Sequence, residues 1–135
     1  MLRRLAIRVV LAEDNYLVRE GMRQLLAAEA DIDVVAVCED SDSLLAAIEA
    51  ERPDVVLTDI RMPPTGTDEG IRVADQLRDT HPEIGVVVLS QFVESQYALA
   101  LLDRGADGRA YLLKERIRDV EQVAGASARL RRTDQ

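Results

Sequence analysis

The segment DVVLTDIRMPPTGTDEG, residues 54–70, carries an apolar run directly into a loop that contains two prolines. Residues 55–57 are consecutive aliphatic side chains, the pattern of a short strand covered on both faces in a parallel sheet. Asp59 stands at the end of this strand, and the Pro-Pro pair at 63–64 cannot continue it because proline has no N–H to donate to a neighbouring strand. The segment therefore predicts a carboxylate at the tip of a buried strand, followed by a loop.

Apolar runs of this kind occur five times along the chain, and segments of helical spacing lie between and after them. The runs are residues 7–12, 32–38, 55–57, 86–89 and 110–113, and helices are expected from about 16 to 26, 44 to 48, 71 to 77, 94 to 104 and from 117 onward. Strand followed by helix, five times over, predicts right-handed crossovers and a doubly wound α/β fold. We expect a five-stranded parallel sheet in the flavodoxin-like order 2-1-3-4-5, with the first strand central and the second at an edge.

The composition is that of one globular domain of 135 residues, 47% hydrophobic and 31% charged. With 17 Lys and Arg against 25 Asp and Glu, the net charge of −8 disfavours nucleic acid, because neutralising phosphates requires excess positive charge. The single cysteine, Cys38, ends an apolar run, so we expect a buried, inert thiol and a reducing compartment. No stretch reaches transmembrane length, and we expect a cytoplasmic protein with no membrane partner.

Polar residues follow the predicted strands at the end of the sheet where doubly wound folds bind their ligands. They are Glu13 and Asp14 after the first strand, Asp59 after the third, Ser90 after the fourth and Lys114 after the fifth. Taken singly, Asp14 and Ser90 could cap helices, and Lys114 could be an ordinary solvated lysine. Asp59 is harder to explain in this way, because no helix is predicted to begin directly after it.

Taken together, these residues predict a phosphoryl site. Neighbouring strands lie roughly 5 Å apart, so Glu13, Asp14 and Asp59 would crowd three carboxylates into one pocket. Like charges at that distance raise each other's pKa unless a cation lies among them. Oxygen ligands with open positions suit Mg²⁺, with Mn²⁺ as an alternative, and such an ion shares its coordination with phosphate. Lys114 and the Ser90 hydroxyl would then face the oxygens of a phosphoryl group on Asp59, since aspartate is a recognised phosphoryl acceptor.

The set of Glu13-Asp14, Asp59 with Met62-Pro63, Ser90 and the run Tyr111 to Lys114 resembles the receiver domain of two-component response regulators. The resemblance spans residue 7 to about 124 and implies a CheY-like fold. The loop MPPTGTDEG and the segment LLKERI are similar to the NarL/LuxR class, in which a helix-turn-helix domain normally follows. We therefore expect a receiver domain over 1–124, with 125–135 as the end of its last helix or the start of a linker to an output domain that is absent from this chain.

This resemblance also implies a role for each site residue. Asp59 is expected to accept phosphate from the phosphohistidine of a sensor histidine kinase; Glu13, Asp14, Asp59 and the backbone carbonyl of Arg61 to hold Mg²⁺; Lys114 and Ser90 to bind the phosphoryl group; and Ser90 and Tyr111 to act as the switch. The surface of the fourth helix, fifth strand and fifth helix would control output, through a phosphorylation-dependent homodimer and through DNA bound by the absent domain. The only reactions expected of the chain are its own phosphorylation and dephosphorylation, so it is not classed as an enzyme.

Three alternatives remain at this point. A phosphatase of the haloacid dehalogenase type also uses an aspartate nucleophile at a strand end, but its general acid two residues later would be Arg61, which cannot give up a proton at neutral pH. A nucleotide-binding module would need a glycine-rich phosphate loop, and none is present. The third is a receiver used alone, as a protein-interaction module.

Two features depart from the receiver pattern, and one histidine lies away from the predicted site. Glu115 follows Lys114 where many receivers have proline, so we expect a trans peptide bond there. The loop is about three residues longer than usual, and we expect residues 65–69 to add mobility and negative charge over the pocket. His81 lies in a proline-bounded loop at the opposite end of the sheet, and we expect an ordinary surface residue.

Overall fold

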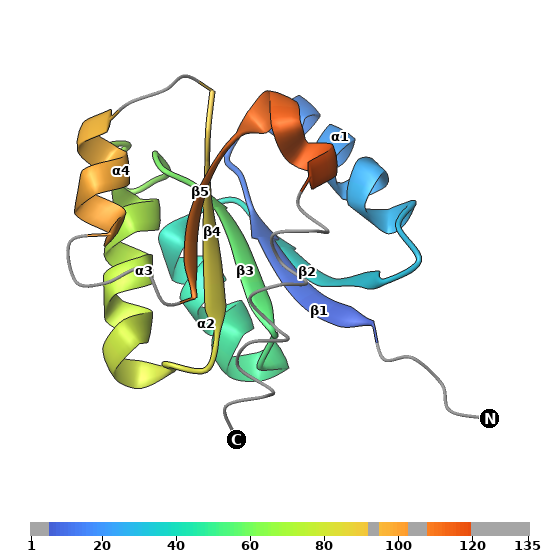
Figure 1. Ribbon diagram of the computed structural model, residues 1–135, viewed down its shortest axis with the longest axis horizontal. Coiled ribbons are helices and arrows are strands. Elements are labelled where there is room, and N and C mark those ends of the chain that lie inside the picture. The colour runs from blue at the N-terminus through green and yellow to red at the C-terminus, as the bar shows by residue number, and fades with distance from the viewer. Residues whose placement is uncertain (1–5, 92–94, 103–107, 120–135) are drawn as a thin grey trace.

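The computed structural model describes residues 6–91, 95–102 and 108–119, and it forms one doubly wound sheet with helices on both faces (Figure 1). In chain order the elements are β1 (Ile7–Ala12), α1 (Tyr16–Ala27), β2 (Ile32–Cys38), α2 (Ser41–Glu51), β3 (Val55–Asp59), α3 (Glu69–Thr80), β4 (Gly85–Ser90), α4 (Ser95–Leu102), β5 (Arg109–Leu113) and the 3₁₀ helix η1 (Lys114–Asp119). All strand pairs are parallel, and the strand order is β2-β1-β3-β4-β5. The predicted fold class and strand order are confirmed.

Alternate side chains of each central strand enter two separate hydrophobic cores. On β1, Val10 and Ala12 belong to the core under α2, α3 and α4, whereas Val9 and Leu11 belong to the core under α1 and η1. All four are fully buried. Because both faces of the sheet are covered, an unbroken apolar run is required on each central strand, and this is why the strands are readable from the sequence.

The strand register brings the carboxyl ends of three strands side by side. Ala12 at the end of β1 pairs with Thr58 on β3, and Thr58 pairs with Val88 on β4. Both positions of the predicted acids, after β1 and at the end of β3, therefore lie at the same edge of the sheet. Every residue of β3 is buried, including Asp59 at its tip.

The predicted helices match, with differences at the end of the chain. The structure describes α4 as Ser95–Leu102, where Leu101 is buried and Leu99 is 72% exposed, and residues 94, 103 and 104 lie outside the described residues. The fifth predicted helix begins as η1, and Ile117 is buried as expected. Its continuation from residue 120 lies outside the described part of the chain. None of the described helices has the length and apolar character needed to cross a membrane.

The prediction for His81 is wrong, because its ring is buried. It is 7% exposed, and its Nε2 lies 3.0 Å from the Glu49 carboxylate on α2. Its Nδ1 lies 2.9 Å from the Thr80 hydroxyl, and its backbone N–H closes the last turn of α3 on Leu77. The sequence around His81 does not indicate that the imidazole ring will reach α2, which lies about thirty residues earlier in the chain. Only the tertiary structure therefore reveals that His81 is buried.

Candidate functional site

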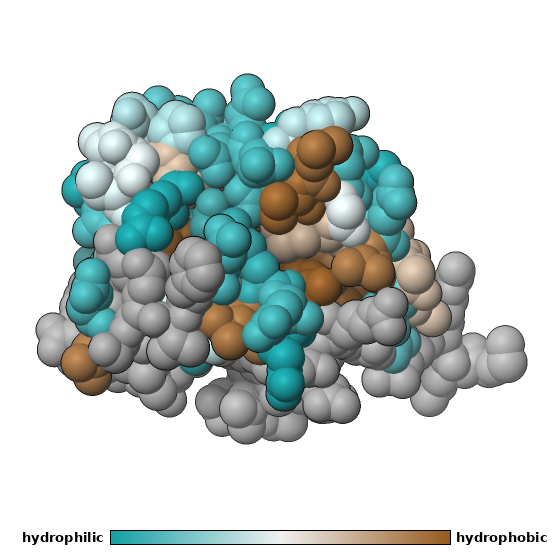
Figure 2. Space-filling view, turned by 90° about the horizontal axis from the view of Figure 1, so that it is seen from above, coloured by the Kyte–Doolittle hydropathy of each residue, from teal (hydrophilic) through white to brown (hydrophobic). Residues whose placement is uncertain are grey.

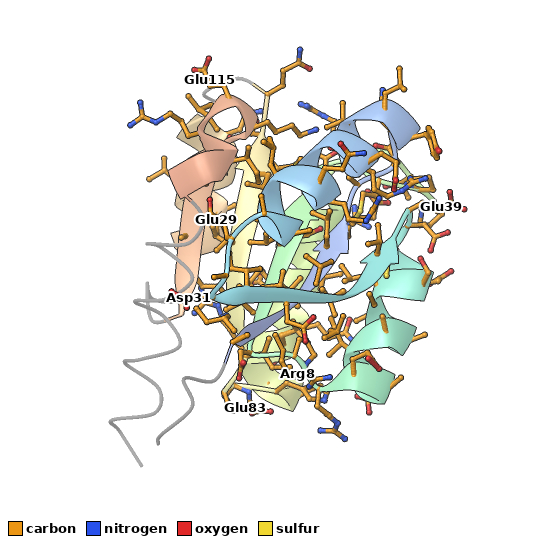
Figure 3. All side chains as sticks on the ribbon, turned by 90° about the vertical axis from the view of Figure 1, so that its right-hand side faces the viewer. Arg8, Glu29, Asp31, Glu39, Glu83 and Glu115 are labelled. Carbon is orange, nitrogen blue, oxygen red and sulfur yellow. The ribbon has the colours of Figure 1, made fainter. Side chains whose placement is uncertain are left out.

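The predicted polar residues meet around one cavity at the carboxyl end of the sheet. The cavity has a volume of about 320 Å³ and is lined by Glu13, Asp14, Asn15, Val18, Asp59, Ile60, Arg61, Ser90, Gln91 and Lys114. Figure 3 shows this end of the sheet uppermost, with Glu39 after β2 and Glu115 after β5 toward it, and Arg8 and Glu83 at the opposite end. Six of the seven predicted site residues therefore share one cavity, and Tyr111 is the exception.

Three carboxylates form the centre of the site. One ligand oxygen from each of Glu13, Asp14 and Asp59 lies within 4.8 Å of the others. Glu13 is fully buried directly after β1, Asp59 is 9% exposed, and Asp14 is exposed. Partial burial raises the pKa of Asp14, and the hydrogen bond and negative charge of neighbouring Glu13 raise it further. Glu13 and Asp14 are adjacent in the chain, so this repulsion acts between sequence neighbours at the end of β1.

Lys114 supplies the positive charge that this cluster requires. Its Nζ lies 2.5 Å from Glu13 Oε1 and 3.3 Å from Asp59 Oδ1. Burial on its own lowers the pKa of Lys114, but the hydrogen bond to Glu13 and the charges of Asp59 and Glu13 outweigh it and raise the pKa above its usual value. Lys114 is thus a paired ammonium directed at the acids, and the alternative of a solvated surface lysine is wrong.

The structure also separates the metal-ligand interpretation of Asp14 from the capping one. Asn15, and not Asp14, is the N-cap of α1, because its Oδ1 accepts the Val18 N–H at 3.1 Å. Asn15 also donates its own N–H to Glu13 Oε2 at 3.2 Å. Asn15 therefore caps α1, and helix capping does not explain the presence of Asp14.

The peptide of Asp59 is enclosed by the beginning of α3. Asp59 Oδ1 accepts the Ile60 N–H at 2.9 Å, and Ile60 O accepts the Gly70 N–H at 2.9 Å. A Cβ on Gly70 would lie 2.1 Å from the backbone oxygen of Asp59, a separation that real Cβ atoms do not show. Gly70 therefore permits the helix to approach Asp59. This role was not predicted from the sequence, in which a glycine at the end of the loop is the only sign of it.

The loop between β3 and α3 differs from the expectation. Glu69 is only 4% exposed, and its carboxylate accepts the N–H groups of Thr65 at 2.7 Å and of Thr67 at 3.1 Å, together with the Thr65 hydroxyl. Burial tends to raise the pKa of Glu69, but these hydrogen bonds lower it to about 2. The predicted negative charge over the pocket is wrong for Glu69, because its charge is used inside the loop.

The two predicted switch residues lie on neighbouring strands. Ser90 is 3% exposed at the end of β4 and lines the cavity, whereas Tyr111 on β5 is partly buried against the core beneath α2, α3 and α4. Tyr111 pairs in register with Val88, two residues before Ser90. The Lys114–Glu115 peptide bond is trans, as expected.

The donor set fits a hard divalent cation. It consists of carboxylate oxygens close enough to share one ion, and Mg²⁺ favours such ligands. Glu13 Oε1 is buried, and the Lys114 ammonium lies directly beside it. Seen from above, the surface at this end is largely hydrophilic with an apolar patch (Figure 2). At the start of α1, Leu17 is 80% and Val18 36% exposed, and Val18 lines the cavity.

Fold and site together define a domain of the CheY-like class. Residues 9–123 match the response regulator receiver domain family, and the chain belongs to that family. The transcriptional regulatory protein DegU of Brevibacillus brevis is 38% identical over 109 residues, which cover 81% of this chain and 44% of that protein. The chain spans about half the length of the curated relatives it matches.

Solved structures agree with this assignment. The signal receiver domain of a NarL response regulator from Mycobacterium tuberculosis superposes with a TM-score of 0.78 at 33% identity, over 91% of this chain and 97% of that one. A LuxR-family DNA-binding response regulator from Staphylococcus aureus gives a TM-score of 0.79 at 28% identity, over 90% of this chain and 98% of that one. The predicted similarity to the NarL/LuxR class is therefore confirmed.

Proposed function

We propose that this domain is a phosphorylation-controlled switch of a two-component system, in which Asp59 accepts a phosphoryl group from the phosphohistidine of a sensor histidine kinase. The observation that carries the proposal is the cluster of Glu13, Asp14 and Asp59 with Lys114 at its centre. An acid cluster built only for stability would be a poor choice, because its members repel one another.

In the proposed reaction, an Asp59 carboxylate oxygen attacks the phosphorus atom, the bond from phosphorus to the histidine nitrogen breaks, and an acyl phosphate forms. The Ile60 N–H and the Lys114 ammonium orient the Asp59 carboxylate through Oδ1. Lys114 and the Ser90 hydroxyl are proposed to contact the phosphoryl oxygens, since phosphoryl transfer depends on positioning and charge neutralisation. Mg²⁺, held by Glu13, Asp14, Asp59 and the carbonyl of Arg61, would supply the rest of that neutralisation.

Output is proposed to follow from the same event. An added phosphoryl group draws Ser90 inward, and the Tyr111 ring, which lies on the adjacent strand, takes up the vacated space. This changes the surface of α4, β5 and the helix that follows, and we propose that the changed surface supports self-association. Because the matched relatives are about twice as long as this chain, DNA would be contacted by a helix-turn-helix domain outside it. The role implies a cytoplasmic location.

Mass spectrometry after incubation with acetyl phosphate and Mg²⁺ tests the acceptor. We expect one addition of about 80 Da, labile as an acyl phosphate is, and its loss in Asp59→Asn. Asp68→Asn is the matched control, since it neutralises an acid that does not line the cavity. Undiminished labelling of Asp59→Asn would refute the assignment.

Beryllofluoride, which mimics an aspartyl phosphate, tests the switch. We expect altered amide exchange in β5 and an increase in mass by sedimentation. Ser90→Ala should reduce both responses while leaving phosphorylation intact, because a ligand shifts a population only through its differential contacts. Unchanged exchange and unchanged mass would refute the proposed output.

A further inference from the structure

The loop between β3 and α3 is closed on itself by one buried acid. The two oxygens of Glu69 divide three donors between them: Oε2 accepts the Thr65 N–H at 2.7 Å and the Thr65 hydroxyl, and Oε1 accepts the Thr67 N–H at 3.1 Å. Glu69 is the first residue of α3, so these bonds join the end of the loop to its middle. We call Glu69, Thr65 and Thr67 the loop clasp.

The same loop is fixed on both sides of Arg61. Before it, Ile60 O accepts the Gly70 N–H at 2.9 Å, directly after Glu69 in the chain. After it, Met62 is fully buried and its carbonyl accepts the Gly66 N–H at 2.9 Å. Arg61 lies between these two fixed residues and lines the cavity. The position of its peptide therefore depends on the path of the loop.

The loop is also hydrogen-bonded to the start of α2, so its path depends on α2 as well as on α3. The Pro63 carbonyl accepts the Ser41 N–H at 3.1 Å and the Ser41 hydroxyl at 3.4 Å. Between this tie and α3, the clasp supplies the hydrogen bonds that hold residues 65 and 67. Without it, several backbone dihedrals of an exposed segment would regain the conformational freedom that ordering removes.

A buried carboxylate is an expensive way to order a loop, because it must lose its hydration. A cap at the exposed surface would order the helix start equally well, and Asp68, the N-cap residue, makes no such side-chain bond. The strong, fully directed bonds of Glu69 instead fix the segment that leads from the acceptor strand. Charge-assisted bonds of this kind are shorter and stronger than bonds between neutral groups.

We propose that Glu69 is a positioning residue for the cation site: by closing the loop clasp it holds the Arg61 peptide at the cavity wall, where the Arg61 carbonyl completes the oxygen ligands. This inference rests on the proposed function, because it assumes that the three carboxylates bind Mg²⁺. It adds to that function a residue that touches neither the cation nor the phosphoryl group. It also distinguishes Glu69 from a loop acid that only stabilises the fold.

The test is a calorimetric titration of the whole chain with Mg²⁺ alone, well below the melting temperature. Glu69→Gln keeps the shape of the side chain but replaces one accepting oxygen with a donor that faces an N–H. We expect Mg²⁺ to bind this variant about tenfold more weakly, the usual effect of losing a group that orients metal ligands. Asp68→Asn removes the same charge one residue earlier and should bind within about twofold of wild type, because the half-buried Asp68 carboxylate pairs with Arg72 and the Thr67 hydroxyl, whereas Glu69 holds the backbone N–H groups of Thr65 and Thr67.

Amide hydrogen exchange gives an independent measurement. The Thr65 and Thr67 N–H groups should exchange faster in Glu69→Gln and remain protected in Asp68→Asn. Thr65→Val removes only the hydroxyl donor and should give a smaller loss of Mg²⁺ affinity, about threefold, in a chain that folds even if Glu69→Gln does not.

The outcomes separate this inference from the proposed function. If wild type binds Mg²⁺, Asp59→Asn does not, and both Glu69→Gln and Thr65→Val bind like wild type, the positioning role is refuted and the phosphoacceptor site stands. A melting temperature that falls while Mg²⁺ affinity stays constant has the same meaning, since it shows a purely structural role. If wild type does not bind Mg²⁺, the proposed cation site is refuted and this inference falls with it.

Discussion

Replacing Gly70 with alanine tests how closely α3 packs against the Asp59 peptide. In most helices, glycine to alanine stabilises by about 0.5–1 kcal/mol, because alanine restricts the unfolded chain and favours the helix. At Gly70 the new Cβ would lie 2.1 Å from the Asp59 backbone oxygen and 3.0 Å from its carbonyl carbon. The atoms in its way belong to the backbone of a central strand, which cannot rotate aside as a side chain would.

The size of the conflict sets the expected loss. Ordinary contact begins at 3.4 Å, so the helix start and the strand end must separate by about 1.3 Å, the difference between 3.4 and 2.1. Overpacking of this kind costs about 1–3 kcal/mol, occasionally more, and the backbone location favours the upper end. We therefore expect Gly70→Ala to lose about 2–3 kcal/mol, which corresponds to a melting temperature lower by roughly 6–10 °C in a domain of this size.

Gly21 in α1 provides the matched control. It is an exposed helical glycine, and a Cβ there meets nothing within 4 Å. Gly21→Ala should therefore raise the melting temperature by about 2–4 °C. The assay is thermal unfolding of both variants and wild type, followed by circular dichroism without added metal. If Gly70→Ala melts at or above the wild-type temperature, the close packing of α3 on the Asp59 peptide is refuted.

Three further predictions concern the charges of the site and of the loop. Asp14→Ala should weaken Mg²⁺ binding in calorimetry yet leave the metal-free melting temperature equal or higher, because Asn15 caps α1 and a repelling charge is gone. Lys114→Met leaves the buried Glu13 carboxylate uncompensated and should lower the free energy of unfolding by about 2 kcal/mol in urea, less than for a fully buried pair, with part restored by Mg²⁺. The folded pKa of Glu69, about 2, lies below its ordinary value of 4.5, so its contribution to stability is complete above 4.5 and is lost as pH falls toward 2. The stability difference between wild type and Glu69→Gln should shrink over that window, and a difference independent of pH would contradict the lowered pKa.

Much of the fold could be predicted because both faces of its sheet are covered. Residues 55–57 had to be aliphatic without interruption, and this requirement marked the strand without any knowledge of its neighbours. The site could be predicted for a related reason. Parallel strands all end at the same edge, so the residues that follow them converge there whatever their distance in sequence, and Glu13, Asp59 and Lys114 are examples.

Other features depend on contacts that no local pattern contains. The burial of His81 depends on Glu49, which lies on another helix. The position of Glu69 in an acidic loop suggested an exposed charge, and only the folded path of the loop turns its carboxylate inward. Asp14 and Asn15 are both good caps by residue type, so the backbone geometry of the turn decides between them.

The balance of charge at the cavity connects the three carboxylates with Lys114. The three clustered carboxylates outnumber the one ammonium that contacts them, so a divalent cation can offset the excess negative charge. Lys114 is shared by Glu13 and Asp59, so it cannot fully compensate either, and burial followed by the contacts and charge of Glu13 raises the pKa of Asp14. A site of this kind is stable enough to fold but is held short of electrostatic balance. Under the proposed function, we expect a cation or phosphoryl group to redistribute the contacts of Lys114, and β5, which ends directly before Lys114, offers a route from there to the core around Tyr111.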